Sequence, residues 1–125
     1  LYDMIMLKDN HIDFAGGVTE ALEKTMLYLR KHDLSLKIIV EARDLDEIQA
    51  ILDHGGADRI LIDNFGIQDT KKAVSLIGDQ CQTESSGGIN EVTLRHYAEC
   101  GVDFISSGAL THSVHNLDLS LKAFK

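Results

Sequence analysis

Cysteine is scarce in this sequence and proline is absent: the 125 residues include only two cysteines, Cys81 and Cys100. Two cysteines without CxxC spacing make neither a disulfide framework nor a zinc motif, which excludes the small disulfide-stapled folds of secreted proteins. No apolar run approaches the roughly 20 residues of a membrane-spanning helix, and no segment has the pattern of a signal peptide. We therefore expect a cytoplasmic protein with reduced thiols and no membrane partner.

Positive charge is also scarce, with 12 Lys and Arg against 20 Asp and Glu and a net charge of −8. Surfaces that bind nucleic acids or anionic membranes need basic patches, so this composition argues against both partners. An anionic substrate would have to bind through a few placed cations, backbone N–H groups or a metal. The length allows at most one domain, and because residue 1 is Leu we expect the chain to belong to a longer protein.

Apolar runs of strand length alternate with segments of helical period. The expected strands are residues 2–7, 36–40, 59–62, 82–84 and 103–105. Apolar residues three and four positions apart predict helices within residues 18–29, 45–52, 73–77 and 94–98. Asp44 with Glu47 has the pattern of a capping box, Asn90 precedes the last helix, and Gly55 and Gly101 lie where helices should end. The alternation predicts βαβ units and a parallel sheet.

An internal repeat refines this prediction. The segments HGGADRILID (54–63) and ECGVDFISSG (99–108) share one plan, and their Asp58 and Asp103 lie 45 positions, or two units, apart. The polar strand ends recur at steps of 22 residues, at Glu41, Asp63, Ser85 and Ser107. We predict an α/β fold that is the C-terminal part of a (β/α) barrel with parallel strands, incomplete in this chain because a full barrel takes about 250 residues. A doubly wound open sheet is the alternative.

Polar residues follow every expected strand. They are Lys8, Asp9, Asn10 and His11 after MIML (4–7), Glu41 and Arg43 after the second strand, Asp63 and Asn64 after the third, and residues 84–88 and 106–108 after the last two. A run of polar side chains at the end of a core strand is costly unless a ligand or ion supplies partners. Active sites of parallel α/β folds lie at the carboxyl ends of the strands. These residues therefore predict one rim of a site.

Two glycine loops at this rim predict a phosphate site. ESSGGIN (84–90) leads toward an expected helix, whose N-terminus would offer free N–H groups and a positive dipole end, and SSGAL (106–110) repeats the device. Phosphate sites in barrels commonly use the last two loops. The alternative is that the glycines merely turn the chain.

Two carboxylates, Glu41 and Asp63, end adjacent strands and should face one another. They repel when both are ionised unless a cation or a developing positive charge lies between them. A divalent metal with a phosphate substrate, or an oxocarbenium-like sugar, would supply that charge. The alternative is a structural ion pair of one carboxylate with Lys8 or Arg43. His112 and His115 lack a third ligand at zinc spacing and are interpreted as surface or interface residues.

The motifs LKDNHI, LIDNF, ESSGGI and GVDFISSGALTHSVHNLDLSLK, in this order, resemble the C-terminal barrel portion of the quinolinate phosphoribosyltransferase family. The resemblance runs from residue 4 to about residue 122. It implies that quinolinate attacks C1 of phosphoribosyl pyrophosphate with Mg²⁺, releasing pyrophosphate and CO₂ and giving nicotinate mononucleotide for NAD biosynthesis. Residues 1–110 would form the partial catalytic barrel, and residues 111–125, with Leu117, Leu119 and Leu121 alternating, a tail strand or helix.

By the same resemblance, the catalytic residues would be Lys8, Glu41 and Asp63. Lys8 would contact quinolinate or pyrophosphate, Glu41 and Asp63 would hold the ribose hydroxyls and the metal, and His11 would line the substrate site. The 5′-phosphate would bind to Ser86, Gly87, Gly88 and Gly108.

The family's basic segment and N-terminal domain have no counterpart in these 125 residues. We therefore expect the chain alone to be inactive and poorly folded, and the activity to belong to a homo-oligomeric parent. The alternatives are a related phosphoribosyltransferase with another acceptor, such as the homologue associated with molybdenum transport, a phosphate-binding barrel isomerase or synthase of the tryptophan or thiamine kind, or a phosphate-binding barrel fragment without activity.

Overall fold

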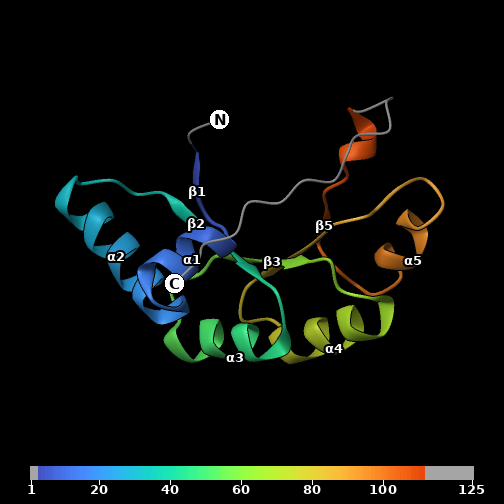
Figure 1. Cartoon of the computed structure of the whole chain (residues 1–125), viewed down its shortest axis with the longest axis horizontal. Helices are drawn as coiled ribbons and strands as arrows, with labels where there is room; N and C mark the ends of the chain where they lie inside the picture. Colours follow the sequence, from blue (N-terminus) through green and yellow to red (C-terminus); the bar gives the residue numbers. More distant parts are fainter. Residues whose placement is uncertain (1–2, 112–125) are drawn as a thin grey trace.

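The computed structural model describes residues 3–111 as alternating strands and helices (Figure 1). The strands are β1 (Met4–Leu7), β2 (Lys37–Ala42), β3 (Arg59–Asp63), β4 (Gln82–Ser86) and β5 (Phe104–Ile105). The helices are α1 (Asp9–Ala15), α2 (Val18–Lys31), α3 (Leu45–His54), α4 (Ile67–Ile77), α5 (Leu94–Ala98) and the 3₁₀ helix η1 (Gly108–Leu110). No helix in this described part of the chain is long and apolar enough to cross a membrane.

The strands form a single parallel sheet in the order β1-β2-β3-β4-β5. A doubly wound sheet reverses its strand order at a switch point, whereas here every strand pairs with its neighbour in sequence. Helices α2, α3, α4 and α5 follow one another around an arc outside the strands (Figure 1). The predicted α/β fold, part of a (β/α) barrel, is confirmed over these five strands, and the doubly wound alternative is wrong.

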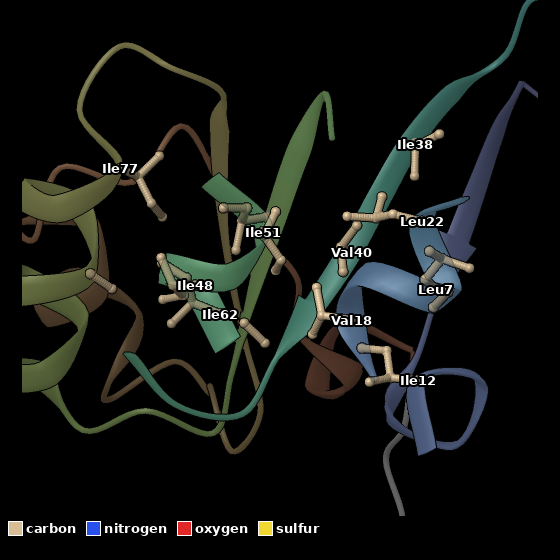
Figure 2. Close-up of a cluster of buried hydrophobic side chains, with 14 of the residues drawn as sticks. Leu7, Ile12, Val18, Leu22, Ile38, Val40, Ile48, Ile51, Ile62 and Ile77 are labelled. Carbon is tan, nitrogen blue, oxygen red and sulfur yellow. The ribbon is translucent and has the colours of Figure 1, made fainter. Parts of the chain in front are cut away.

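The two faces of the sheet have different environments, because successive side chains of a strand point to opposite faces. Val40, Ala42, Ile60 and Ile62 are fully buried against the helices. Figure 2 shows Ile62 beside Ile48 and Ile51 of α3 in this core, and Val40 beside Leu22 of α2. The alternate residues occupy the opposite face, here called the inner face: Ile39, Glu41, Arg59, Leu61, Asp63, Gln82, Glu84, Ser86 and Phe104.

The aspartates of the internal repeat make equivalent contacts at the amino ends of the strands. Asp58 precedes β3, and its Oδ2 accepts a hydrogen bond from Ile38 N of β2 at 2.7 Å. Asp103 precedes β5, and its Oδ2 accepts from Thr83 N of β4 at 2.8 Å. In both cases a carboxylate pairs with an N–H group at the start of the preceding strand. The repeated aspartates therefore connect neighbouring strands of the sheet and are not part of the site.

Several predicted boundaries shift. Strands β2, β3 and β4 extend to Ala42, Asp63 and Ser86, whereas β5 pairs over only two residues. Asp44 caps α3 as predicted, but Glu47 accepts from the N–H of Arg43 rather than completing a capping box. Gly55 is the C-cap of α3.

Helix α5 covers the predicted residues 94–98 but does not reach the cap that the sequence predicted at either end. It ends at Ala98, so that Gly101 lies beyond its cap. Asn90 holds a turn before α5 through its side chain. Residues 112–125, with His112, His115 and the predicted tail element, lie outside the described residues.

Candidate active site at the carboxyl ends of the strands

Glu41 and Asp63 lie on the inner face at the ends of two neighbouring strands. Glu41 is 7% exposed, and its Oε1 accepts a hydrogen bond from Asp9 N at 3.1 Å. Burial raises the pKa of Glu41, the Asp9 N–H opposes this, and the charges of Asp63 and Asp9 raise the pKa further. Because Glu41 pairs with Leu61, two residues before Asp63, the two predicted carboxylates lie on the same face at the ends of neighbouring strands.

Asn64, which the sequence placed at the rim without a specific role, contacts and positions Asp63. Its Nδ2 donates to Asp63 Oδ2 at 2.9 Å, and its backbone N–H donates to the carbonyl of Ser86 at 2.9 Å. The residue has φ of 57°, a left-handed conformation that Asn tolerates better than most residues. The Asp-Asn pair at a strand end was the signal available in the sequence.

The segment after β1 is helical. Asp9 and His11 lie in the first turn of α1, a helix that the sequence did not predict. The backbone N–H of Lys8 donates to His11 Nδ1 at 3.0 Å, so one ring nitrogen of His11 serves as an acceptor within this turn. The exposed Lys8 lies near enough for its charge to lower the pKa of Glu41. Lys8 therefore lies at the same rim as the two carboxylates.

The first glycine loop follows β4 directly. Gly87 has φ of +92°, and a Cβ there would lie 2.2 Å from Asn64 Oδ1 and 2.8 Å from Asn64 N. Only glycine therefore lets this loop pack against the residue that holds Asp63. Gly88 has φ of +62° and no atom within 4 Å of its Cβ position, so its backbone borders open space.

The second glycine loop is tied to the first. Ser107 Oγ donates to the carbonyl of Ile89, which follows Gly88, and Gly108 begins η1. The structure thus brings the two loops together, as the phosphate prediction requires.

The expected helix N-terminus at this loop is wrong, however. Helix α5 begins only at Leu94 and has five residues, and the Asn90 turn separates it from Gly88. Any anion bound here would meet loop N–H groups rather than the end of a helix.

Arg43 does not pair with Glu41. Strand β2 ends at Ala42, and the Arg43 guanidinium binds Glu47 at 2.5 Å and Asp13 at 3.0 Å. The Glu47 hydrogen bond raises the pKa of Arg43 above its ordinary value. Arg43 therefore ties α1 to α3 on the outside, and the alternative of an Arg43–Glu41 ion pair is wrong.

The sequence reasoning missed an ion pair inside the inner face. Arg59 Nη1 lies 2.8 Å from Glu84 Oε2, and the two side chains are 16% and 9% exposed. The signal lay in the period of two: Arg59 precedes Leu61 and Asp63 by two and four residues and so shares their face. Because residues 59–62 were interpreted as one apolar run, the charge of Arg59 on the inner face was overlooked.

No group of three or more potential metal-ligating side chains occurs within residues 3–111. The Glu41–Asp63 pair supplies carboxylate oxygens only, which suits a hard cation such as Mg²⁺ and not zinc. Mg²⁺ is usually held by one or two carboxylates together with substrate phosphates, so this pair fits an ion that arrives with its substrate.

Comparisons with known proteins identify the family of this chain. The family model for the quinolinate phosphoribosyl transferase C-terminal domain matches residues 1–122. The chloroplastic carboxylating nicotinate-nucleotide pyrophosphorylase of Oryza sativa is 41% identical, over 98% of this chain and 37% of its own length. The structure of the nicotinate-nucleotide pyrophosphorylase from Francisella tularensis matches with a TM-score of 0.80 and 37% identity, over 98% of this chain and 42% of that one.

A thiamine phosphate pyrophosphorylase from Pyrococcus furiosus matches with a TM-score of 0.59 at 21% identity, over 82% of this chain and 48% of that one, and so shares the fold alone. The chain spans about two fifths of the length of the curated relatives it matches, between 37% and 41% for those compared. The family match and the site geometry together lead to one conclusion. The chain belongs to the quinolinate phosphoribosyltransferase family, of which it represents the C-terminal domain.

Proposed function

We propose that the protein containing this domain transfers the phosphoribosyl group of phosphoribosyl pyrophosphate to quinolinate with loss of CO₂, giving nicotinate mononucleotide for NAD biosynthesis. The observation that carries the proposal is the Glu41–Asp63 pair on the inner face, beside the two joined glycine loops, in a chain of this family. The domain alone is expected to be inactive, because within residues 3–111 Lys8 is the cation placed at the rim with these carboxylates, and Arg59 of the inner face is already paired with Glu84.

The reaction has two steps. The ring nitrogen of quinolinate forms a bond to C1 of the ribose as the C1–O bond breaks, and that electron pair leaves with pyrophosphate. The C2–carboxylate bond of the pyridinium adduct then breaks, CO₂ departs, and C2 takes up a proton. Positive charge develops on the ribose ring in the first step, and anionic groups held in place stabilise such charge. Glu41 and Asp63 are proposed to serve this purpose and to bind the ribose hydroxyls.

The remaining site residues are assigned by charge and position. Lys8, a compact cation with three donors, is proposed to bind a carboxylate of quinolinate or the pyrophosphate. His11 lines the same rim. The 5′-phosphate is proposed to bind to the loops of Ser86, Gly87 and Gly88, and of Gly108, since phosphates bind well to successive backbone N–H groups in loops.

Mg²⁺ is proposed as the cofactor, with Glu41 and Asp63 as its protein ligands. Burial raises the pKa of Glu41 and the charge of Asp63 raises it further, and a cation between the two carboxylates would relieve their repulsion. When bound, Mg²⁺ would neutralise negative charge on the pyrophosphate as it leaves. A homo-oligomer and a cytoplasmic location also stay predictions, and the Oryza relative is named chloroplastic.

The test is an assay of the full-length protein with Mg²⁺, phosphoribosyl pyrophosphate and either quinolinate or nicotinate, following pyrophosphate and CO₂. We expect turnover with quinolinate only, and a fall of about 10²–10³-fold in kcat/KM for Asp63→Asn. Asp53→Asn is the matched control because Asp53 is exposed at the end of α3, far from the inner face in the fold.

A folded full-length protein that binds phosphoribosyl pyrophosphate but ignores quinolinate would contradict the acceptor and favour the homologue associated with molybdenum transport. Binding of phosphate without any turnover would favour a phosphate-binding barrel without activity. Equal activity of Asp63→Asn and Asp53→Asn would remove the carboxylate role.

A further inference from the structure

Arg59 is a cation on the inner face to which the proposed reaction assigns no part. It begins β3, level with Ile39 of β2 and Gln82 of β4. Its Nη2 donates to Gln82 Oε1 at 3.1 Å, and its Cζ lies 3.6 Å from the centre of the Phe104 ring. Together with the Glu84 ion pair, these contacts connect three strands through one side chain. A largely buried charge is tolerated only with such partners.

Glu84 divides its carboxylate between Arg59 and the start of a glycine loop. Its Oε2 accepts from Arg59 Nη1 at 2.8 Å, and its Oε1 accepts a hydrogen bond from Ser106 Oγ. Ser106 is the first residue after β5 and begins the loop that carries Gly108. The ion pair therefore reaches the second glycine loop through one hydroxyl group.

That loop has two further ties to its surroundings: Ser106 N donates to the carbonyl of Ser85 at 3.0 Å, and Ser107 Oγ donates to the carbonyl of Ile89. Strand β5 pairs with β4 over only two residues, Phe104 and Ile105. Without Arg59, Glu84 would be a buried carboxylate without its counter-charge, on the face that already carries Glu41 and Asp63. A buried charge that has lost its partner is strongly destabilising, so the Glu84 side chain would turn toward other partners, and this change would alter its bond to Ser106.

We propose that Arg59 is a positioning residue: through Glu84 and Ser106 it holds the second glycine loop against the first, in the arrangement that receives the 5′-phosphate. The inference rests on the proposed function, because it concerns the phosphate part of that site. It predicts an effect on phosphate binding that is separate from the binding of quinolinate.

The test uses the full-length protein with the variants Arg59→Met, Arg59→Lys and Ser106→Ala. Dissociation constants are measured calorimetrically for ribose 5-phosphate and for quinolinate, beside the KM for each substrate and the thermal midpoint. Arg95→Met is the matched control, because Arg95 forms an ion pair with Glu99 at 2.8 Å but is 86% exposed on α5.

We expect Arg59→Met to weaken ribose 5-phosphate binding by about tenfold or more, the size of a lost hydrogen bond to a charged group. Binding of quinolinate should change by less than about twofold, and Arg95→Met should change neither. Arg59→Lys should recover part of the loss, and Ser106→Ala, which leaves the ion pair intact, should weaken ribose 5-phosphate by about threefold to tenfold.

Unchanged ribose 5-phosphate binding in a folded Arg59→Met or Ser106→Ala protein overturns the inference, as does an equal loss for both ligands. If Arg59→Met does not fold, Ser106→Ala decides, because it removes one hydroxyl from an exposed residue. If the wild type turns over quinolinate and the variants bind ribose 5-phosphate as the wild type does, the positioning role of Arg59 is rejected and the proposed function stands. A wild type that binds ribose 5-phosphate without turning over quinolinate rejects the acceptor, while the variants still report on Arg59.

Discussion

At the amino ends of the strands, Asp58 and Asp103 make the same contact two units apart, each with an N–H of the preceding strand. At the carboxyl ends, residues that recur at equal spacing make different contacts. Glu41 binds a helix N–H, Asp63 binds an Asn side chain, and Ser107 binds a loop carbonyl. The repeated contacts at the amino ends stabilise the sheet. The residues at the carboxyl ends make different contacts from unit to unit, as expected of barrels, whose active sites lie at that end.

The largest effect should follow from Glu41→Gln, which separates stability from activity. Turnover of the full-length protein should fall by about 10²–10³-fold. The free energy of unfolding at pH 7 should rise by about 0.5–1 kcal/mol, because a buried charge that burial and Asp63 disfavour is removed.

The pH dependence has a definite sign. The pKa of Glu41 is raised in the folded state, so the folded form holds this proton more tightly and loses stability as pH rises from the ordinary value through the raised one. Urea unfolding at pH 4 and pH 7 should show the gain of Glu41→Gln at the higher pH only. Glu23→Gln on the exposed surface of α2 is the control. A Glu41→Gln protein that is less stable than the wild type at pH 7 would contradict the view that the Glu41 charge destabilises the folded state.

Gly87→Ala should have the next largest effect, because it acts on the junction of β3 and the first glycine loop. Its Cβ would lie 2.8 Å from Asn64 N, at a φ of +92°. We expect a loss of about 3 kcal/mol in unfolding free energy, together with lost activity as Asn64 and Asp63 move.

Gly88→Ala is the matched control for stability, since its Cβ position is open and only the strain of φ +62° remains. It should cost about 1 kcal/mol yet weaken ribose 5-phosphate binding, because the added methyl group borders the proposed phosphate position. Equal stabilities of the two variants, measured by urea unfolding, would show that the Asn64 contact does not constrain Gly87.

Asp103→Ala tests the amino ends, where we expect a change in stability without a change in kcat/KM. The loss should be about 1 kcal/mol, because two hydrogen bonds from Thr83 are removed from an exposed carboxylate. The Thr83 N–H lowers the pKa of Asp103, so this contribution is fully present above the ordinary carboxyl pKa and is lost as pH falls through the lowered value. Unfolding should be followed between pH 2 and 7, with Asp79→Ala as the control.

The sequence predicted β1, β2 and β3 well because each is a short, largely apolar run, and glycines end the helices α3 and α4 that follow β2 and β3. Helix α1 was missed because its seven residues bury only Ile12 and leave Phe14 77% exposed, which hides the helical period. The residues of the rim were found because polar side chains interrupt apolar runs. The side chains that these residues contact could not be predicted, because the register that places Glu84 level with Leu61 and Phe104 depends on all three strands.

Arg43→Met should have the smallest effect and marks the outer limit of the site. Arg43 follows Glu41 by two residues, yet its guanidinium contacts Asp13 and Glu47 and is 37% exposed. Exposed ion pairs contribute little, so unfolding free energy should fall by about 0.5 kcal/mol, with kcat and both KM values unchanged. A rise of about threefold or more in the KM for phosphoribosyl pyrophosphate would place Arg43 within the site. The Arg43 guanidinium would then bind substrate instead of the Asp13 and Glu47 carboxylates that it contacts in the structure.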